Sequence, residues 1–145
     1  MYNILVINGP NLNMLGIREP SIYGHADYNG LCEYIKDACV SLPVSLDFFQ
    51  SNHEGAIIDR IQEGYGNVDG IVINAGAYTH YSYAIFDALN SVGIPTVEVH
   101  ISDIHAREEF RHVSVIKPAC LAQICGKGFD GYIEAIELLL NHMEH

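Results

Sequence analysis

The chain has 145 residues, of which 49% are hydrophobic, and its formal net charge at pH 7 is −11. The length suits one domain, residues 1–145, with a sizeable core, and the hydrophobic content argues against disorder. The negative charge disfavours nucleic acid and anionic membranes as partners. No apolar run approaches the ~20 residues of a membrane span, and no signal peptide is visible, so we expect a cytoplasmic protein.

In chain order, short apolar runs alternate with helical patterns. Runs typical of strands lie at 4–7, 44–49, 71–73, 97–101 and 119–125. Between them, apolar residues recur at helical spacing. The predicted helix faces are Leu31, Tyr34, Ile35, Ala38 and Leu42; Ile57, Ile58, Ile61 and Tyr65; Ala84, Ile85, Ala88, Leu89 and Val92; and Ile133, Ile136, Leu139, Leu140 and Met143. Ser51 and Glu54 have capping-box spacing before the second helix. Gly93 followed by Pro95 predicts the end of the third helix.

Strands that alternate with helices predict a parallel sheet covered by helices on both faces. Five such units suggest a flavodoxin-like α/β fold with strand order 2-1-3-4-5. In this fold the site lies beyond the carboxyl ends of the strands. The first four predicted strands end in the polar segments NGPN, QSNHEG, NAGAYTH and EVHISDIHARE.

The fourth strand end has the most informative pattern. Glu98 and His100 are two residues apart, so their side chains point to the same side of the strand, about 6.6 Å apart along it. A carboxylate there would orient the imidazole and raise its basicity, as in a general acid or base. The alternative is a polar pair on an exposed face, but a central parallel strand is normally covered on both faces.

The next segment, ISDIHAREEFR, predicts an anion site. Backbone N–H groups at a helix start, with the Ser102 hydroxyl, would cradle a carboxylate or phosphate. Arg107 and Arg111 are four residues apart, which would place them on one helical face. The alternative is that both are surface arginines paired with Glu108 or Glu109. At the third strand end, Asn74 and His80 are candidates to bind hydroxyl groups.

Motifs for metal, nucleotide or covalent chemistry are missing from the sequence. The eight histidines and four cysteines include no HExxH and no ligand spacing typical of metals, and neither GxGxxG nor GxxxxGK[ST] occurs. Without a CxxC pair, the cysteines are expected to be reduced core residues. The lysines lie outside the polar strand ends, which disfavours a Schiff base. We therefore expect acid–base chemistry on a polyhydroxylated anion, without metal or cofactor.

The loop NGPNLNMLGIREPSIYG, residues 8–24, is longer than the ~2–6 residues usual after a strand of an α/β domain. It contains Arg18 and Tyr23. A tyrosine ordinarily has a pKa near ~10, and a neighbouring arginine favours its phenolate. One interpretation is a lid that brings a phenolate base onto the substrate. The other is a surface loop whose tyrosine only packs.

Four segments together resemble the type II 3-dehydroquinate dehydratases, or type II dehydroquinases: NGPNLNMLGIREPSIYG, FFQSNHEGAIIDRIQ, INAGAYTH and EVHISDIHAREEFR. They occur in the family's order and spacing over nearly the whole chain. The resemblance implies a flavodoxin-like fold and anti elimination of water from 3-dehydroquinate to 3-dehydroshikimate through an enolate. It also implies no metal or cofactor and a homododecamer built of trimers, and it leaves open whether the pathway is aromatic biosynthesis or quinate breakdown.

The resemblance also implies roles for single residues. Tyr23 matches the base that takes a proton from C2, and Arg18 matches the arginine that keeps this base ionised. His100 matches the general acid that protonates the departing C1 hydroxyl, and Glu98 matches its orienting carboxylate. Asn11 matches the residue that stabilises the enolate oxygen through a water.

Further residues match binding positions of the family. They are Ile101 and Ser102 for the substrate carboxylate; Asn74, His80 and Arg111 for the ring hydroxyls; Asp87, contributed across a subunit interface; and Arg107 in support. The sequence departs from the common family pattern at Tyr81, Tyr83, Phe86, Asp103 and Lys127. None of these departures removes a catalytic role, but Tyr81 and Asp103 neighbour the expected site.

Two alternatives from other classes are a non-catalytic anion-binding module and a flavin-binding electron carrier on the same fold. The set Asn11, Arg18, Tyr23, Glu98 and His100 argues against the first, because binding alone needs no acid–base pair.

Overall fold

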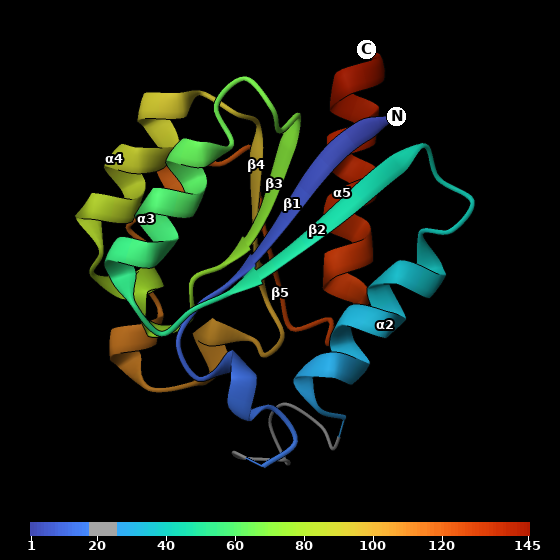
Figure 1. Ribbon diagram of the computed structural model, residues 1–145. Helices are drawn as coiled ribbons and strands as arrows, with labels where there is room; N and C mark the ends of the chain where they lie inside the picture. Colours follow the sequence, from blue (N-terminus) through green and yellow to red (C-terminus); the bar gives the residue numbers. More distant parts are fainter. Residues whose placement is uncertain (18–25) are drawn as a thin grey trace.

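The computed structural model describes residues 1–17 and 26–145. Five parallel strands form one sheet in the order β2-β1-β3-β4-β5, which confirms the predicted flavodoxin-like topology. The strands are β1 (Tyr2–Asn8), β2 (Val44–Gln50), β3 (Gly70–Asn74), β4 (Thr96–His100) and β5 (Ala122–Cys125). All run in one direction, so their carboxyl ends meet at one edge of the sheet, at the bottom of Figure 1.

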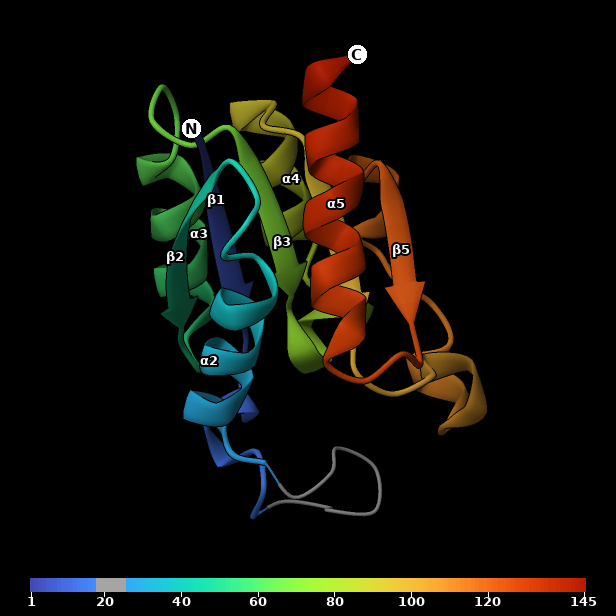
Figure 2. The ribbon, with the colours of Figure 1, turned by 90° about the vertical axis from the view of Figure 1, so that its right-hand side faces the viewer.

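Helices cover both faces of the sheet. The helices α2 (Tyr28–Ala38) and α5 (Asp130–Glu144) pack on one face, and α3 (Glu54–Glu63) and α4 (Tyr83–Val92) on the other (Figures 1 and 2). Successive side chains of β1 point to opposite faces of the sheet. Ile4 and Val6 belong to the core on the side of α2 and α5, and Leu5 and Ile7 belong to the core on the side of α3 and α4. The central strands are buried on both faces, as expected of a parallel sheet.

The helix boundaries partly match the sequence patterns. Gly93 ends α4 with a φ of 66°, and its N–H donates to the carbonyl of Leu89, as predicted. The predicted capping box is wrong, because α3 begins after His53, and Ser51 Oγ instead accepts a hydrogen bond from His53 N. Leu42 and Tyr65 lie beyond the ends of their helices, and Tyr34 is partly exposed.

The chain between β4 and β5 differs most from expectation. It forms three short 3₁₀ turns, Ile104–Ala106, Glu109–Arg111 and Lys117–Ala119, where an α-helix was predicted after Ser102. Strand β5 begins at Ala122 and not at residue 119, because the third turn, with Pro118 in its first positions, precedes it. Arg107 follows the first turn and Arg111 ends the second, so the prediction that they share a helical face is wrong.

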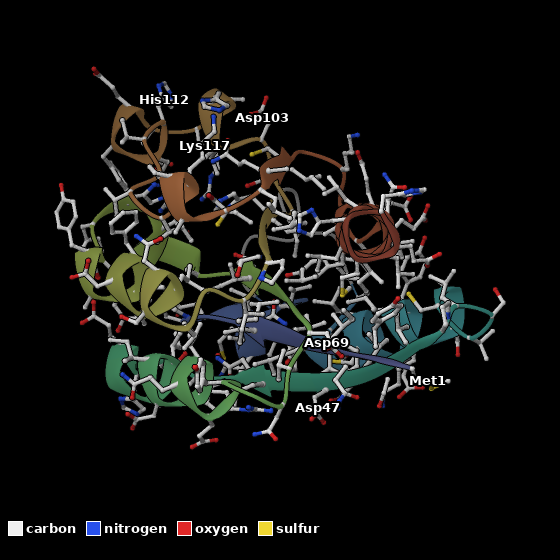
Figure 3. All side chains as sticks on the ribbon, turned by 90° about the horizontal axis from the view of Figure 1, so that it is seen from above. Met1, Asp47, Asp69, Asp103, His112 and Lys117 are labelled. Carbon is white, nitrogen blue, oxygen red and sulfur yellow. The ribbon has the colours of Figure 1, made fainter. Side chains whose placement is uncertain are left out.

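Charged side chains lie around the outside of the sheet and helices. Figure 3 shows Asp47 and Asp69 on one side of the molecule and Asp103, His112 and Lys117 on the other, all exposed. In the part of the chain that the structure describes, no helix is both long and apolar enough to span a bilayer.

Candidate active site

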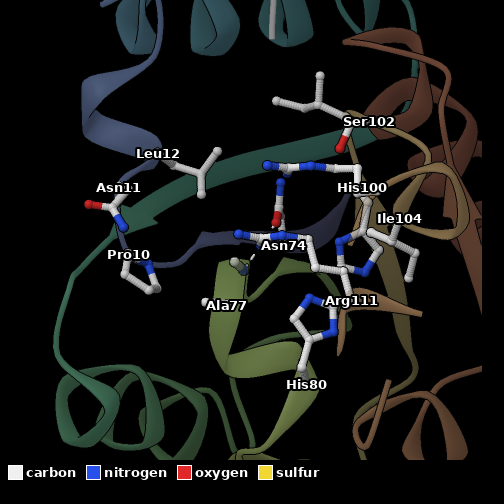
Figure 4. A pocket seen from close by; sticks show the side chains of 13 residues that line it. Pro10, Asn11, Leu12, Asn74, Ala77, His80, His100, Ser102, Ile104 and Arg111 are labelled. Carbon is white, nitrogen blue, oxygen red and sulfur yellow. Dashed lines mark hydrogen bonds between the residues drawn. The ribbon is translucent and has the colours of Figure 1, made fainter. Parts of the chain in front are cut away.

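A pocket opens at the carboxyl ends of β1, β3 and β4, where the sequence predicted the site. Its lining residues are Pro10, Asn11, Leu12, Asn74, Gly76, Ala77, His80, His100, Ile101, Ser102, Ile104, Arg107 and Arg111. Figure 4 shows His80, His100 and Arg111 grouped on one side of this pocket, with Pro10 and Asn11 across from them. The lining contains two arginines and, among the described residues, no carboxylate, so it suits an anionic ligand.

The acid–base pair lies at the end of β4. Glu98 is completely buried and His100 is 5% exposed, and His100 Nε2 is hydrogen-bonded to Glu98 Oε2. The prediction that the two side chains share one side of the strand is confirmed. Because Nε2 is engaged with the carboxylate, Nδ1 is the ring nitrogen left for a substrate.

The Glu98 carboxylate accepts hydrogen bonds from three side chains. Ser114 Oγ donates to Oε1 at 2.8 Å and Gln123 Nε2 donates to Oε2 at 3.0 Å, in addition to the bond with His100. Burial would raise the pKa of Glu98, but the hydrogen bond and attraction from His100, with those from Gln123 and Ser114, lower it below its ordinary value. Glu98 is therefore an ionised acceptor, and His100 Nε2 carries a hydrogen.

His80 is held as a neutral hydrogen-bond acceptor. It lies at the end of a 3₁₀ helix, Gly76–His80, that follows β3, and its Nδ1 is 2.8 Å from the carbonyl oxygen of Val113. A carbonyl oxygen only accepts, so Nδ1 donates and Nε2 keeps its lone pair. Burial lowers the pKa of His80, and the nearby His100 and Arg111 lower it further, against the opposing effects of the Val113 carbonyl and Glu98.

The arginines enter the pocket from the short turns after β4. Arg107 follows the turn Ile104–Ala106, and Arg111 ends the turn Glu109–Arg111. Arg111 Nε donates to Glu108 Oε2 at 2.6 Å, so one of the predicted surface pairings is present, yet Arg111 is only 16% exposed. The Arg111 guanidinium thus bonds to a carboxylate outside the pocket while it also lines the pocket.

Asn11 lies in the loop after β1, and Asn74 is the last residue of β3. Asn11 has a φ of 71°, and its N–H donates to Asn52 Oδ1 at 3.0 Å, which ties the loop after β1 to the loop after β2. Asn74 is buried, and its side chain bonds to Gly76 N and to the hydroxyl of Tyr132.

The remaining predicted residues fall in three groups. Ile101 and Ser102 line the pocket, and their carbonyls accept from Gly128 N and Gly126 N. Asp87 lies on the exposed side of α4, away from the pocket lining of this chain. Arg18 and Tyr23 lie outside the described residues.

Of the departures from the family pattern, Tyr81 and Tyr83 are exposed, at 60% and 68%, and neither is among the lining residues. Asp103 is also exposed, and its carboxylate accepts from His105 N.

Three residues that hold side chains of the site were not predicted from the sequence. Ser114 and Gln123 hold Glu98, and Tyr132 holds Asn74. The only available signal was strand register, because Gln123 on β5 pairs directly with Glu98 on β4.

Among the described residues, no group of three or more His, Cys, Asp or Glu side chains is arranged to hold a metal ion.

The sequence and the fold match known proteins over almost their full length. Residues 2–140 match the family model described as dehydroquinase class II. The chain belongs to the class II dehydroquinase family.

Close relatives agree with this assignment. A protein named 3-dehydroquinate dehydratase from Caldicellulosiruptor saccharolyticus is 61% identical over 96% of this chain and 97% of its own length. One of the same name from Clostridium acetobutylicum is 59% identical over 95% and 96%. The crystal structure of a type II dehydroquinase from Butyrivibrio crossotus is 60% identical, covers 96% of this chain and 97% of its own, and superposes with a TM-score of 0.94.

Proposed function

We propose that this chain, a 3-dehydroquinate dehydratase by its family and its relatives' names, eliminates water from 3-dehydroquinate through an enolate, with Tyr23 as base and His100 as general acid. The observation that supports this most directly is the buried Glu98–His100 pair, which opens into a pocket lined by two arginines. Burying an ionised carboxylate carries a desolvation penalty, so a buried pair of this kind beside a pocket is typical of a functional site.

The reaction takes one proton and returns another. The base removes the proton on C2, the electron pair is held as the enolate of the C3 carbonyl, and its return expels the C1 hydroxyl. His100 protonates this hydroxyl from Nδ1 as it leaves, so that water departs. The Glu98 carboxylate orients the imidazole through its bond to Nε2, which leaves Nδ1 for the leaving hydroxyl.

The binding roles are those that the family resemblance implies, and the residues concerned line one pocket. The turn of Ile101 and Ser102 receives the substrate carboxylate near Arg107. Asn74, His80 and Arg111 bind the ring hydroxyls, with His80 Nε2 accepting a hydrogen bond. Asn11 stabilises the enolate oxygen through a water.

The base and the assembly rest on the sequence motif. Arg18 favours the phenolate of Tyr23, whose pKa would otherwise be near ~10 and too high for a base at neutral pH. Asp87, on the exposed side of α4, contributes to a neighbouring subunit's site in a homododecamer built of trimers. The enzyme acts without metal or cofactor in the cytoplasm.

The first experiment mixes the purified protein with 3-dehydroquinate in the presence of a chelator and follows the ultraviolet absorbance of the conjugated enone of 3-dehydroshikimate. A rise at a rate proportional to protein concentration supports the proposal. Absence of a rise, with binding detected by calorimetry, would support an anion-binding module. Flavin absorbance of the purified protein would support the electron carrier.

The base is tested by Tyr23→Phe. Loss of the phenolic oxygen should lower kcat by about 10²- to 10⁴-fold, the usual contribution of a general base, while calorimetry shows ligand binding close to that of the wild type. Tyr81→Phe is a matched control, because Tyr81 is exposed and outside the pocket lining, and it should keep wild-type kinetics. Wild-type turnover in Tyr23→Phe would show that another residue is the base.

A further inference from the structure

A buried tyrosine joins the two strands from which the middle of the pocket is built. Tyr132 lies in the first turn of α5, and its side chain has no exposed surface. Its hydroxyl donates to Asn8 Oδ1 at 2.6 Å and accepts from Asn74 Nδ2 at 3.0 Å. Asn8 is the last residue of β1, Asn74 is the last residue of β3, and the two are direct partners in the sheet.

The direction of these hydrogen bonds is fixed by the backbone. Gly76 N lies 3.2 Å from one end of the Asn74 amide, and a backbone N–H can only donate, so that end is the acceptor Oδ1. The other end, Nδ2, then faces the Tyr132 oxygen and donates to it. Since Nδ2 cannot accept, the Tyr132 hydrogen goes to Asn8 Oδ1. A tyrosine hydroxyl can satisfy both amides because it donates and accepts at once.

The loops that leave these two strands are in close contact. Gly9 N donates to the carbonyl of Asn74 at 2.7 Å, and a Cβ on Gly9 would lie 2.5 Å from the carbonyl oxygen of Ala75. Gly76 has a φ of +60°, and a Cβ there would lie 3.0 Å from the carbonyl oxygen of Pro10. A shift of the Asn74 side chain would therefore be transmitted to both loops, which have no room to absorb it.

These loops supply opposite sides of the pocket. Asn11 follows β1 at two residues beyond Gly9, and His80 ends the 3₁₀ helix that begins at Gly76. The ring of Tyr132 packs in the core between the sheet and α5, and this packing does not need the hydroxyl. Its hydroxyl, in contrast, bonds only to the two amides at the strand ends among the contacts of the described residues.

We propose that Tyr132 is a positioning residue for the dehydratase site. Its hydroxyl holds the Asn74 amide with Nδ2 as the donor end and fixes the spacing between the loop of Asn11 and the loop of His80. Tyr132 itself does not line the pocket, so it acts through Asn74. This inference rests on the proposed function, because the effect of Tyr132 is measured through the KM for 3-dehydroquinate.

The test is Tyr132→Phe in the full chain, assayed with 3-dehydroquinate. The substitution keeps the ring and removes only the hydroxyl. KM should rise about five- to tenfold, which corresponds to the loss of roughly one neutral hydrogen bond. We expect kcat to change less than about threefold, because the hydroxyl bonds directly to Asn74, which binds the ring hydroxyls, whereas Asn11 keeps its own hydrogen bond to Asn52. The control is Tyr34→Phe, whose hydroxyl bonds to Asp130 at the same end of α5 but on the surface, and its KM should stay at the wild-type value.

A double-mutant cycle separates positioning from simple support of the fold. In an Asn74→Ala background, Tyr132→Phe should raise KM by less than about twofold, because the group through which it acts is gone. An equal rise in both backgrounds would overturn the proposal, as would a Tyr132→Phe protein with a lower Tm but wild-type KM. If Tyr132→Phe does not fold, Asn8→Ala removes the hydroxyl's acceptor and is judged by the same KM criterion. Absence of turnover by the wild type would refute the proposed function instead.

Discussion

Strand β4 and the chain that follows it supply two parts of the pocket, and these parts differ in how firmly the protein fixes them. Glu98 and His100 lie within the strand, almost without exposed surface, and the carboxylate accepts hydrogen bonds from three residues. Arg107 follows one short 3₁₀ turn a few residues later, and Arg111 ends the next turn, beside the exposed Phe110. One side is fixed by the sheet, and the other is attached to it by turns.

This difference matches two different demands. A group that transfers a proton must lie within hydrogen-bond reach of the reacting atom, and small displacements cost much of the rate. A group that binds an anion tolerates some movement, because charge interactions fall off gradually with distance. We therefore expect kcat to depend mainly on Glu98 and His100, and KM mainly on the two arginines.

The largest expected effect comes from His100→Ala. Removing the general acid should lower kcat by about 10²- to 10⁴-fold, with a smaller change in KM, as measured by enone absorbance. His142→Ala is the matched control, because His142 lies on α5, is exposed and is outside the pocket lining. A loss of less than about tenfold in His100→Ala would mean that water supplies the proton and would remove the contrast between the two sides.

Arg111→Ala should have an intermediate effect, on KM. The loss of a hydrogen bond to a charged group costs about 1.5–3 kcal/mol, so KM should rise by about ten- to 100-fold while kcat changes little. In the control Glu108→Gln, Arg111 keeps its guanidinium and loses its ion pair, and KM should change by less than about threefold. A fall in kcat as large as that of His100→Ala would place Arg111 with the reacting groups.

The smallest expected effect is on stability against acid. The pKa of Glu98 in the folded chain is below its ordinary value of 4.5, so the folded state binds this proton less readily than the unfolded state does. The stability that the ionised Glu98 contributes is therefore present above about pH 4.5 and lost as the pH falls through the lower folded pKa.

Urea unfolding measured between pH 7 and pH 3.5 checks this difference. The free energy of unfolding of the wild type should fall more steeply below pH 4.5 than that of Glu98→Gln, by at most about 1.4 kcal/mol per pH unit for one proton. Parallel curves for the two proteins would show that the strand pair is not held as an ionised carboxylate.

Much of this architecture could be predicted because the signals are local. The apolar runs of β1 and β3 and the helix end at Gly93 depend on neighbouring residues, and the period of a strand was enough to pair Glu98 with His100. The resemblance to the family then assigned roles that spacing alone left open.

The failures have physical reasons as well. The segment around Arg107 has the spacing of a helix, but after Ile104 it buries no apolar side chain up to residue 113, and Phe110 is 64% exposed. Tertiary contacts therefore shape it into turns. Ser114, Gln123 and Tyr132 reach their partners from 16 to 124 residues away, and no local pattern reports such contacts.

The hydrogen bond from His80 to the carbonyl of Val113 also limits which inhibitors can bind. It leaves a lone pair on Nε2 facing the ligand, so a bound molecule must offer a hydrogen there. An analogue that carries a methyl ether in place of that hydroxyl would oppose one lone pair to another, whatever its fit in shape. Inhibitors built for this site should therefore combine an anionic group for the arginines with a hydroxyl or amine for His80.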